Sequence, residues 1–202
     1  GGSKGLGLAM ARGFAQAGAD VVIASRKLDA CKAAASEIAE ATGQRCLPVA
    51  CHVGDWSQCA ELVDSTLSEF GRVDILINNA GLSSPPQPMA PDDVWNAGFN
   101  LKFTTVRRLT NAFMPEMRAR GWGRIINVTG IVEPAGTSAS LAACAAVHAW
   151  AKGLSRDLAP DGITVNCVPP GRIDSEQSRE RLHADPVAKQ KHIEANIPMG
   201  RF

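Results

Sequence analysis

Apolar residues in this chain fall into short continuous runs that alternate with longer stretches of helical period. The runs predict buried strands at residues 21–24, 46–50, 73–77, 124–128 and 163–168. The stretches between them predict helices at about 6–17, 28–41, 56–70, 92–120 with a break near Pro115, and 139–159. Strands that alternate with helices indicate a parallel sheet covered on both faces, joined by right-handed crossovers.

The chain opens on a glycine-rich segment, Gly1-Gly2-Ser3-Lys4-Gly5-Leu6-Gly7. Glycines in this G-x-x-x-G-x-G spacing let the backbone turn tightly and approach a pyrophosphate, and let the following helix pack closely on a sheet. The amino end of that helix then favours phosphate oxygens. The segment therefore predicts a dinucleotide site. A strand is expected directly before such a loop, and this sequence begins inside the motif.

Polar or glycine-containing segments follow three of the predicted strands, at residues 78–81, 127–130 and 169–171. The carboxyl ends of parallel strands share one edge of a sheet, and ligands of such folds bind there. We therefore expect these segments and the glycine loop to form one site.

The composition of the chain narrows the class of protein and its partners. The chain has 202 residues, 21 basic and 20 acidic side chains and a net charge of +1, without a basic block. This balance argues against nucleic acid or an anionic membrane as partner, and no apolar run reaches membrane-spanning length. The six cysteines contain no C-x-x-C pair, which is typical of reduced thiols in the cytoplasm. We predict no metal site.

The motifs together resemble the short-chain dehydrogenase/reductase family over nearly the whole chain. The matching segments are Asn78-Asn79-Ala80-Gly81, Asn100-Leu101-Lys102, Gly123–Val128 and Pro170-Gly171, together with the glycine loop. The resemblance implies an α/β fold with a Rossmann-type doubly wound parallel sheet. It implies one dinucleotide-binding domain over residues 1–202 with a lid at about 172–198. Family members also carry a first strand before the loop and a further helix and strand after Phe202, and both are absent from this sequence.

Charge indicates which cofactor binds. Sites that prefer NAD place an acidic residue just after the second strand, whereas this chain has Ser25 and Arg26 there and Lys4 in the loop. An arginine can form paired hydrogen bonds to a 2′-phosphate, so we predict NADP(H). The alternative is that Arg26 and Lys4 are solvated surface charges. The predicted cofactor-binding residues are Gly1, Ser3, Lys4, Gly5, Leu6, Gly7, Ser25, Arg26, His52, Val53, Asn79, Ala80, Gly81, Pro170, Gly171 and Ile173.

The catalytic residues depart from the family pattern, which uses Asn, Ser, Tyr and Lys with the last two spaced Y-x-x-x-K. This chain has no tyrosine. Aligning its long last helix with the family places Ser140 at the Tyr position and Cys144 at the Lys position, and Gly130 replaces the Ser with Thr129 beside it. The predicted catalytic residues are Asn100, Thr129, Ser140 and Cys144. The alternative interpretation is that Cys144 and the nearby His148 are helix-packing or subunit-interface residues.

The resemblance implies an NADP(H)-dependent oxidoreductase that acts on a small-molecule carbonyl or alcohol with an altered catalytic tetrad. Two alternatives stay open: a nucleotide-binding protein without hydride turnover, and a non-redox lyase or isomerase. Small residues on the helical stretch at 142–158 permit close helix contact, and family members commonly associate through this helix and the one at 102–117. We therefore expect a homodimer or homotetramer.

Overall fold

The computed structural model describes residues 1–81, 87–130, 136–171, 173–175, 179 and 185–201. Its contacts divide the chain into a compact unit, Gly1–Pro169, and a shorter unit, Pro170–Phe202. The first unit contains the described strands and all but one of the described α-helices. The second contains a single described helix, α7 (Pro186–Asn196), whose amino end is capped by the Asp185 carboxylate accepting from the Val187 N–H at 2.9 Å.

All described strands are parallel, as the sequence predicts, and they form two sheets. In the first sheet β1 (Val21–Ser25) pairs with β2 (Cys46–Ala50), with Val21 opposite Cys46. In the second, β4 (Gly123–Val128) lies between β3 (Ile75–Asn78) and β5 (Ile163–Val168). Pro48 has no N–H to donate to a ladder, and β2 accordingly has β1 as its only described sheet neighbour.

The helices of the first unit follow the predicted stretches closely. They are α1 (Gly5–Gln16), α2 (Leu28–Thr42), α3 (Trp56–Phe70), α4 (Asp92–Phe99), α5 (Thr105–Arg120) and α6 (Ala139–Leu158). Glycines 43, 71 and 121 end α2, α3 and α5 in the left-handed conformation that favours glycine. A 3₁₀ turn, η2 (Ala159–Asp161), extends α6.

The predicted break near Pro115 is wrong. Helix α5 continues through Pro115 to Arg120, and the interruption lies earlier, at the π-helical segment η1 (Asn100–Thr104) between α4 and α5. Pro115 is exposed, while Leu109, Phe113 and Met117 on the opposite face are buried. Burial of that apolar face favours the helix and offsets the hydrogen bond that the proline cannot make.

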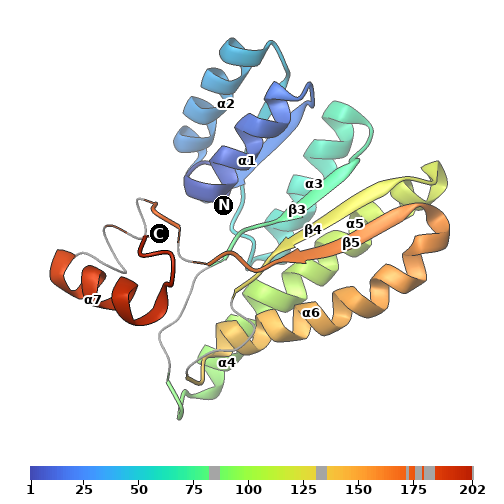
Figure 1. Cartoon of the computed structure of the whole chain (residues 1–202). Coiled ribbons are helices and arrows are strands. Elements are labelled where there is room, and N and C mark those ends of the chain that lie inside the picture. The colour runs from blue at the N-terminus through green and yellow to red at the C-terminus, as the bar shows by residue number, and fades with distance from the viewer. Residues whose placement is uncertain (82–86, 131–135, 172, 176–178, 180–184, 202) are drawn as a thin grey trace. The chain divides into compact units, whose positions relative to one another are not determined.

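Two apolar cores hold the helices and sheets together. The smaller one packs α1 and α2 on β1, with Ile23, Cys31 and Ile38 at its centre. The larger one joins α3, α5 and α6 to β4 and β5, and partly buried residues of β1 and β2 also pack against it. Figure 1 shows α6 running alongside β5, and these two elements are in contact. The helices therefore connect the two sheets through side chains.

A cavity of about 530 Å³ lies between β1 and β3. Its wall includes residues 21, 22 and 24 of β1, residues 75–78 of β3 and apolar side chains of α1 and α5. Ile75, Leu76 and Ile77 are only partly buried in consequence. The two strand edges that face this cavity have no sheet partner among the described strands.

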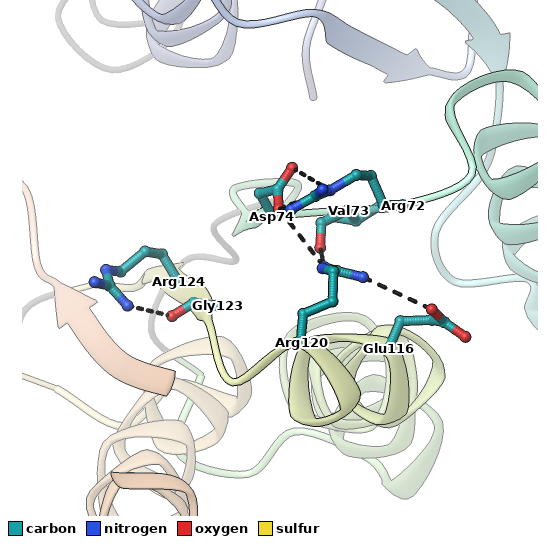
Figure 2. A network of polar contacts seen from close by, with 7 residues as sticks. All are labelled: Arg72, Val73, Asp74, Glu116, Arg120, Gly123 and Arg124. Carbon is teal, nitrogen blue, oxygen red and sulfur yellow. Dashed lines mark hydrogen bonds and ion pairs between the residues drawn. The ribbon is translucent and has the colours of Figure 1, made fainter. Parts of the chain in front are cut away.

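The amino ends of β3 and β4 carry a separate polar network (Figure 2). Asp74 accepts from the Arg72 guanidinium at 2.6 Å, and Arg120 donates to the Val73 carbonyl at 2.8 Å while its charge lies 3.6 Å from Asp74. Arg120 also lies 3.7 Å from Glu116 one helical turn earlier. These charges neutralise one another at the edge of the sheet opposite the predicted ligand site, so the network ties the end of α5 to the start of β3.

Candidate functional site

The glycine loop is shaped by close contacts that exclude side chains. A Cβ on Gly7 would overlap the Gly1 carbonyl oxygen and come within 2.8 Å of Asn79 Nδ2. Gly5 has a φ of +54°, a backbone conformation that L side chains rarely adopt. Helix α1 begins at Gly5 without a side-chain cap at Lys4 and without an acidic residue in its first turn. Its amino end thus offers N–H groups and a positive dipole end to an anion.

The loop touches the ends of both sheets. Gly2 N–H donates to the Ala24 carbonyl of β1 at 2.9 Å, and Asn79 Nδ2, just after β3, donates to the Gly1 carbonyl at 3.1 Å. The structure therefore brings together the loop, the end of β1 and the Asn79–Gly81 turn, as predicted from their positions in the sequence. Ala80 also lies against Gly1, whose missing Cβ would come 3.4 Å from the Ala80 backbone.

The end of β1 is joined to the loop through hydroxyl groups. Ser3 Oγ and Ser25 Oγ lie 2.9 Å apart, and Ser25 Oγ lies 3.1 Å from the buried Cys31 Sγ. Arg26 and Lys4 are both exposed. Ser25 is therefore fixed beside the loop, and the exposed Arg26 follows it directly in the chain at the end of β1.

The end of β2 forms the neighbouring wall. His52 is exposed, and its backbone N–H donates to the Gln58 side chain at 2.9 Å. The Val53 carbonyl accepts from Thr105 Oγ1 at 2.6 Å, and the Gly54 carbonyl accepts from Asn100 Nδ2 at 2.8 Å. Asn100 therefore opens the π-helical segment η1 and holds the His52–Gly54 turn in place. Sequence reasoning identified Asn100 but not this contact.

Lys102 is a residue that sequence reasoning did not assign to the site. A Cβ on Gly81 would overlap the Lys102 ammonium, so this cation lies directly against the turn after β3. The signal available in the sequence was the placement of a lysine two residues after Asn100 in the motif. The glycine at 81 leaves room for that side chain.

The carboxyl end of β4 carries a second side-chain pair. Thr129 Oγ1 lies 2.9 Å from His148 Nε2 of α6, and the Thr129 N–H donates to the Val168 carbonyl at 3.0 Å. Both side chains are half-buried. Gly130 faces α6 at Leu141 and Cys144, with its missing Cβ 3.8 Å from Cys144 Sγ. Sequence reasoning named Thr129, but it associated His148 with Cys144 because they share a helix stripe.

The two other predicted catalytic residues are inside the protein. Ser140 and Cys144 are each 4% exposed, and Ser140 Oγ lies 3.5 Å from the buried Ser138 Oγ. Ser140 and Cys144 are therefore less accessible than Thr129, which is only partly buried.

The described thiols are free and mostly buried. Burial, followed by the neighbouring Cys59, raises the pKa of the Cys51 thiol to about 12, and burial raises that of Cys46 to about 11. Thiols with raised pKa values are poor nucleophiles at neutral pH, which identifies these two as packing groups.

Pro170, Gly171 and Ile173 belong to the second unit and follow β5 directly in the chain. The predicted lid at about 172–198 includes residues 172, 176–178 and 180–184, which lie outside the described residues. Helix α7 covers the later part of that range. None of the helices in the described part of the chain has the length and hydropathy to cross a membrane.

Known proteins resemble this chain in sequence and in fold. The family model for "short chain dehydrogenase" matches residues 1–186. A short-chain type dehydrogenase/reductase from Sinorhizobium fredii (strain NBRC 101917 / NGR234) is 34% identical over 98% of this chain and 80% of its own length.

Two solved structures extend the comparison. The L-sorbose reductase of Gluconobacter frateurii, complexed with NADPH and L-sorbose, superimposes with a TM-score of 0.93 at 34% identity, over 100% of this chain and 81% of its own. An NADPH-bound short-chain oxidoreductase of Pseudomonas aeruginosa PAO1, described as containing an atypical catalytic centre, gives a TM-score of 0.89 at 30% identity, over 100% and 81%. The chain therefore belongs to the short-chain dehydrogenase/reductase family.

Proposed function

We propose that this protein is an NADP(H)-dependent oxidoreductase that interconverts a carbonyl and an alcohol with an altered catalytic tetrad. The observation that carries the proposal is the loop at the start of α1, where Gly7 is in backbone contact with Gly1 and Ser25 is hydrogen-bonded to Ser3. This arrangement leaves backbone atoms of Gly1, Gly2 and Gly7 beside the start of α1, which has no side-chain cap.

The residues present fit a phosphorylated dinucleotide. The amino end of α1 would hold the pyrophosphate, and Arg26 and Lys4 would hold the 2′-phosphate. The His52–Val53 turn would line the adenine side, and Asn79–Gly81 the middle of the dinucleotide. The bound nicotinamide, when reduced, supplies a hydride. The chain's own residues bind and orient the cofactor and provide a proton to the developing alcohol.

The structural relatives support this choice of cofactor. The Gluconobacter reductase and the Pseudomonas oxidoreductase are both NADPH complexes, and both cover the whole of this chain. The absence of an acidic residue after β1 agrees with them. L-sorbose is thus a reasonable first substrate to test, within a panel of ketoses, β-keto esters and aldehydes.

A second function is favoured by one specific observation. The chain has no tyrosine, so the family's usual acid is absent. A protein that binds NADP(H) without hydride turnover, or that uses the pocket for lyase or isomerase chemistry, would share the same nucleotide site.

Two measurements separate these functions. Fluorescence titration with NADPH and NADH tests the nucleotide site, and we expect NADPH to bind more tightly. Stoichiometric oxidation of NADPH in the presence of the carbonyl panel tests turnover. Tight NADPH binding with no oxidation on any carbonyl favours the protein without hydride turnover, and equal affinity for the two nucleotides contradicts the assignment of NADP(H).

We further propose that the protein acts in the cytoplasm as a homodimer or homotetramer that associates through α5 and α6. Ala145 and Ala149 are exposed on α6, together with Gly153, and small residues allow two helices to approach closely. Light scattering of the purified protein at micromolar concentration tests the proposed oligomeric state. A monomer would overturn it.

A further inference from the structure

The pair formed by Thr129 and His148 joins two elements that are distant in the sequence. Thr129 follows the end of β4, and His148 lies in the middle of α6. Their Oγ1 and Nε2 atoms are 2.9 Å apart, which is within hydrogen-bond distance in either direction. No part of the family pattern given above calls for a histidine here.

We propose that Thr129 and His148 form the proton relay that replaces the missing tyrosine in carbonyl reduction. The relay rests on the proposed oxidoreductase function. In this relay Thr129 is the catalytic residue, because its hydroxyl would donate to the substrate oxygen. His148 is a positioning and proton-supplying residue that acts through Thr129.

The location of Thr129 supports this role. β4 is the middle strand of its sheet, and ligands of such sheets bind beyond the carboxyl ends of the strands. The Thr129 N–H is bonded to Val168, which fixes the backbone at the end of the strand. The next residue is Gly130, so no side chain from that position covers the approach to the hydroxyl.

The chemistry of the pair is suited to proton transfer in both directions. An imidazole gains and loses a proton near neutral pH, and its two nitrogens can accept at one atom while donating at the other. A hydroxyl can accept a proton on one lone pair while it gives its own away. A threonine hydroxyl alone is a poor acid, and the adjacent imidazole overcomes this by restoring its proton.

In the reductive direction the carbonyl carbon accepts a hydride together with its electron pair. The π electrons of the carbonyl move to its oxygen, which takes the proton of Thr129 Oγ1. Thr129 Oγ1 in turn takes the Nε2 proton of protonated His148, and the neutral imidazole recovers a proton from water. The substrate thus gains one hydride and one proton, and the nicotinamide is oxidised. Alcohol oxidation follows the same path in reverse.

The other hydroxyl and thiol near this end of α6 are worse placed. Ser140 and Cys144 are each only 4% exposed, whereas Thr129 and His148 are half-buried. Cys144 and His148 also have the four-residue spacing of the family's Tyr-Lys pair. Because residues four apart lie on one helix face, the imidazole of His148 is one turn after Cys144 on the same face of α6.

The first test compares variants on one helix and one strand end. We expect Thr129→Val and His148→Ala each to lower kcat by about 10²–10⁴-fold. The dissociation constant for NADPH should change by less than about threefold in either variant. The matched control is Lys152→Gln, an exposed residue one turn further along α6, which we expect to keep the parent rate. Added imidazole should restore part of the His148→Ala rate and none of the Thr129→Val rate, an effect that a merely structural role does not produce.

The second test does not depend on turnover. In ¹⁵N NMR spectra of the histidine side chains, His148 of the parent should show one dominant neutral tautomer, fixed by Thr129. Thr129→Val should redistribute that histidine between its two tautomers and leave His192 on α7 unchanged.

The outcomes are distinguishable. A parent that does not bind NADPH contradicts the proposed function, while the tautomer measurement still decides whether the pair exists. If the parent is active and His148→Ala keeps the full rate, the relay is overturned. It is also overturned if added imidazole does not raise the rate of His148→Ala. Unchanged tautomers in Thr129→Val overturn the hydrogen bond on which it rests.

Discussion

The two ends of the candidate site differ in how their residues are held. At the glycine loop, backbone atoms form the surface: Gly1, Gly2 and Gly7 touch one another or the ends of β1 and β3. At the end of β4, side chains form it, through the Thr129–His148 pair and the buried Ser140 and Cys144. A backbone surface tolerates little beyond glycine, whereas a side-chain surface can be rebuilt by substitution. This difference agrees with the proposed function, in which the glycine loop binds the nucleotide and the residues at the end of β4 form an altered catalytic site.

The sharpest way to test the nucleotide end is to reverse the charge at Arg26. We expect Arg26→Asp to weaken NADPH binding by about 1.5–3 kcal/mol for each charge-assisted hydrogen bond lost, on the order of 10–150-fold. An aspartate there can also accept from a ribose hydroxyl, so the affinity for NADH should rise. Fluorescence titration with both nucleotides measures the change.

The matched control for this variant is Lys27→Asp. It makes the same charge change at the next exposed residue, which is the amino-terminal cap of α2. An equal loss of NADPH affinity in both variants would show that only the general charge of this surface matters.

The next largest effect tests the backbone surface itself. We expect Gly7→Ala to destabilise the fold by about 1–3 kcal/mol, because the new methyl group overlaps the Gly1 carbonyl rather than a flexible side chain. Gly13→Ala in the same helix meets nothing within 4 Å and should instead stabilise by about 0.5–1 kcal/mol. Urea denaturation of the two variants decides the question, and similar midpoints would contradict the close approach.

The helix ends, the strands and the glycine loop could be predicted from the sequence because each depends on local pattern. Gly7, for example, lies within a motif whose spacing alone predicts close packing. The Thr129–His148 contact could not be predicted this way, since it depends on how α6 lies beside β4 and on the rotation of α6 about its axis. The prediction of a break at Pro115 was wrong for a similar reason: the burial of Phe113 and Met117 outweighed the local preference of proline against a helix.

A smaller effect on stability is expected from the buried thiol near the end of β4. Cys144→Ala removes one buried atom next to Gly130, and we expect a loss of about 1 kcal/mol in the free energy of unfolding. Cys46→Ala, at a less buried thiol, should cost less. If the two variants unfold at the same urea concentration, Cys144 is not a packing residue.

The smallest effect concerns the turn proposed to line the adenine side. Hydrogen bonds from Ser57, and then from Gln58, lower the pKa of Asp55, which caps α3. A carboxylate whose pKa is lowered in the folded state stabilises above its unfolded pKa of about 3.9. This contribution is lost as the pH falls through the lower folded value.

Asp55→Asn keeps a capping oxygen that does not titrate in this range. Below about pH 4 the melting temperature of the parent should therefore fall more steeply than that of Asp55→Asn. Parallel melting curves across that range would contradict the assignment.

The contacts of the glycine loop give the proposed nucleotide an effect on stability as well as on chemistry. The loop is hydrogen-bonded to Ala24 of β1 and to Asn79 after β3, so its ordered form depends on the folded arrangement of both strands. A ligand that binds only the ordered loop is thermodynamically linked to folding. At a concentration 100 times its dissociation constant, such a ligand adds about 2.7 kcal/mol to the free energy of unfolding. Under the proposed function, the supply of NADPH would therefore influence how long each molecule stays folded.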